Sequence, residues 1–139
     1  METTHEQVNQ AMQEERTRYS DQELEEFRQI IQKKIDKTRE ELEYLEASMK
    51  EESQSQQNEQ GKYMENTAET YSRDQNAQLA ARLSKFLQNL ESAMVRIENR
   101  TYGICKSTGK LIAKERLRAV PHTTLSMEAK ARQKNSTGR

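Results

Sequence analysis

Cys105 is the single cysteine of the chain and its best candidate for a nucleophilic side chain. A thiol becomes a good nucleophile when a neighbouring base or cation favours its thiolate form, but no partner base is evident in the sequence around Cys105. The two histidines, His5 and His122, are far apart. The sequence also holds no glycine-rich phosphate loop and no paired-carboxylate signature. We therefore predict that the protein has no catalytic residues and is not an enzyme.

Charged side chains are divided unevenly between the two halves of the chain. Residues 1–70 hold 18 acids and 9 bases, residues 71–139 hold 5 acids and 14 bases, and residues 100–139 carry a net charge of +8. Two antiparallel helices that attract each other would explain this asymmetry. The alternative is a basic surface for an acidic protein or a nucleic acid. Because aromatic residues are few and the bases are scattered, we expect no direct sequence-specific binding of nucleic acid.

The chain has too little apolar material for a thick globular core. Hydrophobic residues make up 32% and charged residues 33% of the 139 residues, and the mean hydropathy is −1.19. One proline and four glycines are too few for the many turns of an all-β protein. This composition suits helices that each bury one apolar stripe, so we predict an all-α fold.

The compartment can also be predicted from the composition. A single cysteine cannot form an intramolecular disulfide, which favours a reducing environment. The first residues contain no basic segment followed by an apolar run, so we expect no secretory signal. No stretch of 18 apolar residues is present to span a membrane. We predict a cytoplasmic protein with no membrane partner.

Two heptad-like series of apolar residues predict an antiparallel coiled-coil hairpin. Ser20 and Glu23 form a capping box at the start of the first helix, which we expect to run from residue 21 to about residue 59. Its seam consists of Leu24, Phe27, Ile31, Ile35, Thr38, Leu42, Leu45 and Met49. After a polar reversal near Gly61, the returning seam consists of Leu79, Leu83, Phe86, Leu90, Ala93 and Ile97. The candidate caps of the returning helix are Thr67, Thr70 and Ser72.

The segment after the hairpin carries a pattern of specific residues. It reads Tyr102-Gly103-x-Cys105-x-x-Thr108-Gly109-x-x-Ile112, and then Arg116-Leu117-x-Ala119-x-Pro121-x-x-x-Leu125-Ser126-x-x-Ala129. This pattern resembles the TraR/DksA-type regulators of bacterial RNA polymerase, which have an aromatic residue, Gly, Cys-x-x-Cys-Gly, Ile, Arg-Leu, Pro and a second Cys-x-x-Cys. The resemblance covers about residues 20–133, and its specific part is 102–129.

The resemblance implies a coiled-coil hairpin followed by a small zinc-finger-like module with a short C-terminal helix. We expect a flexible or weakly helical segment over residues 1–19 and the hairpin over 20–101, with its tip near 53–70. A degenerate finger module would follow over 102–133 and a tail over 134–139. We expect the second long helix to end around residues 99–101 and Thr124 to cap the last helix, which would reach Gln133.

The four zinc-ligand positions implied by the resemblance hold Cys105, Thr108, Ser126 and Ala129. A structural zinc site needs four ligands, and here hydroxyls and a methyl group replace three thiolates. Even with His122 the donors fall short, so we predict that no zinc binds. We expect a hydrogen bond between Thr108 and Ser126 and a small apolar cluster to take its place. The cluster would consist of Ile104, Leu111, Ile112, Leu117, Val120, Leu125 and Met127.

The resemblance also implies a mechanism and a partner. Family members insert the coiled-coil tip into the secondary channel of core RNA polymerase, and DksA-type tips carry Asp-x-x-Asp-x-Ala. Carboxylates there could perturb a bound cation or its neighbours. Counting back from Cys105 without gaps places this motif on Lys62-x-x-Glu65-x-Thr67. Because an insertion could shift the register, Ala68 and Glu69 are tip candidates as well.

Some family members also bind guanosine tetraphosphate at the polymerase interface through the globular module. A basic face for this nucleotide could consist of Lys106, Lys110, Lys114, Arg116, Arg118 and Lys130, although Arg116 could equally serve a structural salt bridge. We expect no other cofactor. A polymerase regulator would be a monomer with an intramolecular hairpin. The alternative, a structural or adaptor coiled coil for another protein, predicts homo-oligomers through the same seams.

Overall fold

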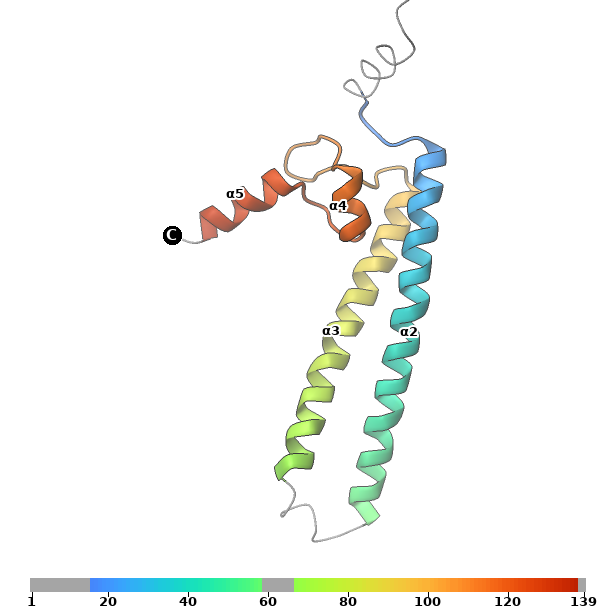
Figure 1. Cartoon of the computed structure of the whole chain (residues 1–139), viewed down its shortest axis with the longest axis vertical. Helices are drawn as coiled ribbons and strands as arrows, with labels where there is room; N and C mark the ends of the chain where they lie inside the picture. Colours follow the sequence, from blue (N-terminus) through green and yellow to red (C-terminus); the bar gives the residue numbers. More distant parts are fainter. Residues whose placement is uncertain (1–15, 59–66, 138–139) are drawn as a thin grey trace, which may run out of the picture. The chain divides into compact units, whose positions relative to one another are not determined.

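The computed structural model describes residues 16–58 and 67–137, and these segments are mostly helical (Figure 1). The helices are α2 (Asp21–Asn58), α3 (Thr67–Glu98), α4 (Lys114–Ala119) and α5 (Met127–Thr137). The described segments contain no β-strand and only one isolated bridge, between Ile104 and Leu111. The predicted all-α fold is therefore confirmed. No helix in these segments is long and apolar enough to cross a membrane.

The chain divides into two compact units, and both long helices pass from one unit into the other. The hairpin unit comprises residues 32–91, and the finger unit comprises residues 1–31 together with 92–139. The start of α2 and the end of α3 therefore belong to the same unit as α4 and α5.

In the hairpin unit α2 and α3 run antiparallel and bury one stripe each (Figure 1). Ile35 and Leu90 are among the most buried side chains there, as their heptad positions predict. Thr38 is the polar interruption of the seam, and its hydroxyl donates a hydrogen bond to the Lys34 carbonyl (2.6 Å). Because the helix itself satisfies this hydroxyl, Thr38 can be buried among apolar neighbours without an unpaired polar group.

One position of the returning seam is wrong by a single residue. Leu79 was expected to face α2, but it is 40% exposed, whereas the neighbouring Ala80 is 9% exposed. Successive residues of an α-helix are rotated by about 100° (3.6 residues per turn), so burying Ala80 turns Leu79 towards solvent. Both residues are apolar, and hydrophobicity alone does not select between them.

The capping box that starts α2 is confirmed. The Ser20 hydroxyl accepts a hydrogen bond from the Glu23 amide (3.2 Å), and the Glu23 carboxylate accepts one from the Ser20 amide (3.1 Å). Glu23 also lies in the first turn, where its negative charge suits the helix dipole. Local hydrogen bonds thus fix the start of α2 at the boundary that the sequence predicts.

The C-terminal part of the chain differs from expectation at three points. The last helix, α5, runs to Thr137 and not to Gln133, so it includes part of the predicted tail over 134–139. A short helix, α4, occupies residues 114–119, which the sequence did not single out as helical. The last helix is capped by Ser126 and not by Thr124, because the Ser126 hydroxyl accepts a hydrogen bond from the Ala129 amide (3.1 Å). Thr124 instead uses its backbone carbonyl to accept a hydrogen bond from Lys106 (2.9 Å), inside a turn that precedes the helix.

Candidate functional site

A turn with left-handed residues follows the end of α3 and leads into the finger. Arg100 and Gly103 both have positive φ angles, 63° and 82°. The amides of Thr101 and Tyr102 donate to the Arg96 carbonyl, which closes the end of the helix in place of the regular pattern. Tyr102 is fully buried, its hydroxyl donates to the Pro121 carbonyl (2.8 Å), and burial raises the pKa of this phenol. Tyr102 therefore joins the helix end to the loop before α5.

Three of the four positions that the resemblance assigns to metal ligands meet at the buried sulfur of Cys105, which is 1% exposed; they are Cys105, Thr108 and Ser126. The Ser126 amide donates a hydrogen bond to Cys105 Sγ (3.3 Å), and Ser126 Oγ lies 3.6 Å from the same sulfur. Ala129 is buried, and its amide is tied to the Ser126 hydroxyl. A hydrogen-bonded cluster thus surrounds the one sulfur at these positions.

Thr108 also belongs to this cluster, through an interaction with the Cys105 sulfur that the sequence did not indicate. A direct bond between Thr108 and Ser126 was expected, but in the structure both residues interact with the Cys105 sulfur. Burial raises the pKa of the Cys105 thiol, whereas hydrogen bonds from Thr108 and Ser126 outweigh it and lower the pKa to about 6. At neutral pH the sulfur is therefore mostly a thiolate that protein donors stabilise.

These residues do not fit a zinc ion. A structural zinc site uses four Cys or His ligands, whereas this cluster contains one thiolate, two hydroxyls and a methyl group. Among residues 16–58 and 67–137, no group of three or more His, Cys, Asp or Glu side chains is placed to hold a metal. The donors around Cys105 thus fall short of the four ligands of a structural zinc site, and hydrogen bonds surround the sulfur instead.

The apolar cluster beneath this site is largely the expected one. Ile112 and Leu117 are fully buried, and Ile104, Leu111, Val120 and Leu125 are partly buried. Met127 is an exception, because its side chain is 67% exposed. It is the first residue of α5, and its sulfur accepts a hydrogen bond from the Arg116 guanidinium at the surface (3.0 Å).

The six residues of the predicted basic face do not form one uniform surface. Arg116 donates to the Leu125 carbonyl (2.8 Å) and to the Thr123 hydroxyl (3.3 Å), so it ties α4 to the turn before α5. Lys114 forms an ion pair with Glu23 (2.6 Å). The other four are exposed: Lys106, Lys110, Arg118 and Lys130. Two of the six bases therefore serve contacts within the finger unit.

The predicted tip lies mainly outside the described residues. Lys62 and Glu65 belong to the segment 59–66, to which no structure is assigned. Thr67, Ala68 and Glu69 form the first turn of α3. The register of the tip motif therefore stays a prediction.

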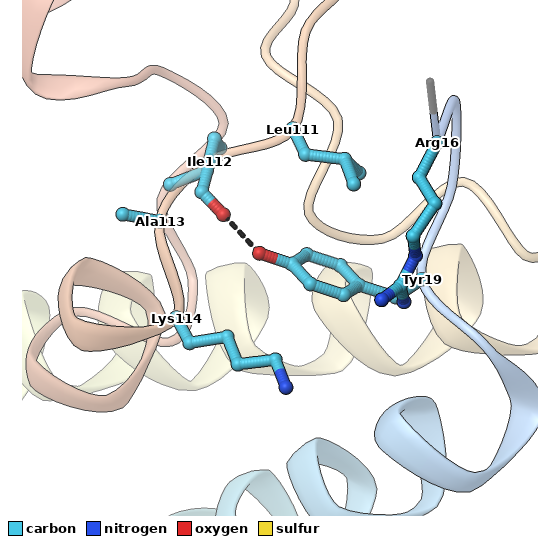
Figure 2. Close-up of a pocket in the computed structure, with 6 residues that line it drawn as sticks. All are labelled: Arg16, Tyr19, Leu111, Ile112, Ala113 and Lys114. Carbon is cyan, nitrogen blue, oxygen red and sulfur yellow. Dashed lines mark hydrogen bonds between the residues drawn. The ribbon is translucent and has the colours of Figure 1, made fainter. Parts of the chain in front are cut away.

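One group of residues in the finger unit escaped the sequence reasoning (Figure 2). The Tyr19 hydroxyl donates a hydrogen bond to the Ile112 carbonyl, 93 residues away in sequence. The Tyr19 ring packs edge-on against Phe27, with 5.6 Å between ring centroids, and it also contacts Gly103. The left-handed Gly103 was a signal that something approaches the turn closely, but nothing local to Tyr19 identifies it as the partner.

Comparison with known proteins agrees with this geometry. Residues 100–135 match the family model described as "Prokaryotic dksA/traR C4-type zinc finger". A segment of 51 residues is 39% identical to "RNA polymerase-binding transcription factor DksA" of Caulobacter vibrioides, covering 37% of this chain and 36% of that protein. A segment of 47 residues is 38% identical to "General stress protein 16O" of Bacillus subtilis, covering 34% and 29%. The matched segments thus span about a third of the length of these relatives.

A solved structure is similar over most of the chain. The "transcription factor DksA2 from Pseudomonas aeruginosa" has a TM-score of 0.75 and 22% sequence identity, with 84% of this chain and 86% of that chain covered. At this identity the likeness concerns the fold. Together with the family-model match, the comparisons show that residues 100–135 are similar to the dksA/traR zinc finger and that the fold is similar to that of DksA2, although this finger lacks three of the four cysteines.

Proposed function

We propose that this protein is a transcription regulator that binds core RNA polymerase directly and inserts its coiled-coil tip into the secondary channel. The support is the family match at the finger, together with a relative whose name states that it binds RNA polymerase. A fold match over 84% of the chain supports the overall architecture that this role would use. The protein acts by binding and not as an enzyme, since its one buried cysteine is surrounded by hydroxyls and amides instead of a general base.

The shape of the helices suits such a role. At about 1.5 Å per residue the 38 residues of α2 span about 57 Å. The buried stripe is narrow, so the outer faces of both helices are free to meet the walls of a channel. At the tip we propose Lys62, Glu65, Thr67, Ala68 and Glu69 as the residues that approach the polymerase centre. The Lys in place of a first acid predicts an effect on transcription that differs from that of DksA-type tips.

For guanosine tetraphosphate we propose the exposed bases of the finger unit. Lys106, Lys110, Arg118 and Lys130 are exposed and can reach an anionic ligand at the polymerase interface. Lys114 and Arg116 were part of the same prediction, but their ion pair and hydrogen bonds within the finger make them weaker candidates. We further propose that the finger folds without zinc and that the protein is a cytoplasmic monomer.

Association with the polymerase can be tested directly. The purified chain is mixed with core polymerase of its own source at micromolar concentration, and the complex is separated by size-exclusion chromatography. Co-elution with core enzyme in a one-to-one ratio supports the proposal. Elution of the whole chain apart from the polymerase, at concentrations where the protein is well folded by circular dichroism, contradicts it.

An adaptor role is the second candidate, and exposed apolar side chains favour it. In the hairpin unit Tyr44, Tyr71 and Leu79 are all exposed and so are available to a partner. A coiled-coil adaptor would use such positions to bind a protein or a second copy of itself. Multi-angle light scattering separates the two functions, since an adaptor of this kind forms stable homo-oligomers and the polymerase regulator is a monomer.

A further inference from the structure

A pocket of about 320 Å³ lies in the finger unit, between the segment that precedes α2 and the segment that precedes α4 (Figure 2). It is lined by Arg16, Tyr19, Leu111, Ile112, Ala113 and Lys114. These residues come from two segments more than 90 positions apart, so the pocket exists only in the folded unit. None of them belongs to the Cys105 cluster or to the tip.

The polar side of the pocket is a cationic corner built around one carboxylate. Glu23 has a largely buried side chain, and its two oxygens pair with Arg16 and with Lys114. Two positive charges therefore share one negative charge, which leaves a net charge of +1 at the corner. Arginine has five N–H donors and lysine three, whereas Glu23 takes one contact from each among the described residues. Donors on both cations remain available for a second anion.

The rest of the pocket lining is apolar. Tyr19 is only 5% exposed, its hydroxyl donates to the Ile112 carbonyl, and the Arg16 guanidinium lies over its ring, 5.6 Å from the centroid, so the ring helps to position Arg16. Leu111 is only partly buried and Ala113 is exposed, so both can contact a ligand. Burial raises the pKa of Tyr19, while the positive charges of Arg16 and Arg118 oppose this effect, so both cations lie near the ring.

We propose that this pocket binds a small organic anion, with its phosphate or carboxylate group on Arg16 and Lys114 and an apolar body on Leu111 and Ala113. Convergent cations beside an apolar wall are the usual means of orienting such ligands in a concave site. A bound ligand would connect the segment before α2 with residues 111–114 and so stabilise the finger unit. This proposal goes beyond the proposed function and does not depend on it.

The test uses the full chain and four defined probes. Phenyl phosphate and benzoate each carry the charge and the apolar body, inorganic phosphate carries the charge alone, and benzyl alcohol carries the body alone. Binding is followed by amide ¹H–¹⁵N chemical-shift changes. We expect saturable shifts at residues 111–114 with phenyl phosphate or benzoate, and an affinity at least about fivefold weaker for each of the two partial probes. Which of the two complete probes binds tighter distinguishes a phosphate from a carboxylate ligand.

Two substitutions move the affinity in opposite directions. Lys114→Gln removes a cation and weakens the complete probe by about threefold to tenfold. Glu23→Gln removes the competing carboxylate, keeps the capping box because glutamine serves there equally, and tightens the probe by a similar factor. Lys85→Gln is the matched control, since this exposed lysine of the hairpin unit lies outside the pocket and its removal leaves the affinity unchanged.

The opposite sign for Glu23→Gln is the decisive result, because general loss of structure cannot strengthen binding. Shifts that concentrate around Lys106 and Lys130 instead of residues 111–114 would overturn the proposal. Equal affinity for inorganic phosphate and phenyl phosphate would also overturn it, since the apolar wall would then contribute nothing. Absence of saturable shifts at millimolar probe would do the same.

Discussion

Gly103 offers the sharpest test of how the finger unit is packed. A Cβ atom at this position would lie 2.6 Å from Cε2 and 2.7 Å from Cδ2 of the Tyr19 ring, and 3.3 Å from Leu117 Cδ1. The φ angle of +82° adds a backbone cost of about 1–2 kcal/mol for a residue other than glycine. Overpacking against a fixed ring costs about 1–3 kcal/mol more. We therefore expect Gly103→Ala to lower the free energy of unfolding by about 2–5 kcal/mol.

The structure supplies a matched control for this substitution. Gly109 also has a positive φ, 72°, but a Cβ there would meet nothing within 4 Å. Gly109→Ala should therefore cost only the backbone contribution of about 1–2 kcal/mol. Urea denaturation followed by circular dichroism and tyrosine fluorescence gives both values. Equal losses for the two variants would refute the steric part of the argument.

A double substitution separates the ring contact from the backbone. Tyr19→Ala alone removes a buried aromatic side chain and its hydrogen bond to Ile112, so it is destabilising by itself. In the Tyr19→Ala background the clash with the ring is absent, and the further cost of Gly103→Ala should fall towards that of Gly109→Ala, with only the 3.3 Å approach to Leu117 Cδ1 remaining. If Gly103→Ala lowers the free energy of unfolding by the same amount in that background, the Tyr19 ring is not the source of the steric clash.

Three further predictions concern the Cys105 cluster and the helix cap. The pKa of Cys105 is lowered to about 6, below the ordinary thiol value of about 8.5, so the free energy of unfolding should rise as the pH goes from 6 to 9 and should fall as the pH drops through 6. Thiolate absorbance at 240 nm and denaturation at several pH values check this prediction. Cys105→Ala should remove both the absorbance and the pH dependence. A triple variant with Thr108→Cys, Ser126→Cys and Ala129→Cys should bind one zinc ion, as measured by metal analysis. The natural chain should bind none and should keep its helicity in the presence of a chelator. Failure of the triple variant to bind zinc would mean that these four positions do not have the geometry of a zinc site. Ser20→Ala removes half of the capping box and should cost about 1 kcal/mol in denaturation, while retained stability would show that the cap is unimportant.

The parts of the fold that could be predicted from the sequence are those set by local interactions. The start of α2 depends on Ser20 and Glu23, three residues apart, and the buried stripe of α2 follows the heptad spacing. The choice between Leu79 and Ala80 depends on how closely α2 approaches, and local hydrophobicity holds no such information. A periodic pattern therefore predicts that a helix pairs, but it does not fix every residue of the contact.

The candidate site was predictable in its positions but not in its interactions. The spacing around Cys105 and Ser126 identified the positions that meet in the finger, because the family pattern fixes them. That Thr108 and Ser126 both turn to the sulfur, and so lower its pKa, depends on the loop geometry. The contact between Tyr19 and Ile112 joins segments 93 residues apart, and a single sequence contains no trace of it.

The central claim, that the coiled-coil tip enters the polymerase, is tested most directly by a crosslink from the tip. A photoreactive residue replaces Glu65 in the full chain, the protein is mixed with core polymerase of its own source, and the crosslinked peptides are identified by mass spectrometry. The same residue at the exposed Glu115 of α4 serves as the control, which should crosslink elsewhere. We predict that position 65 crosslinks to the lining of the secondary channel. Crosslinks from position 65 only to other surfaces, or none at near-stoichiometric micromolar protein, would contradict the claim and favour the adaptor function.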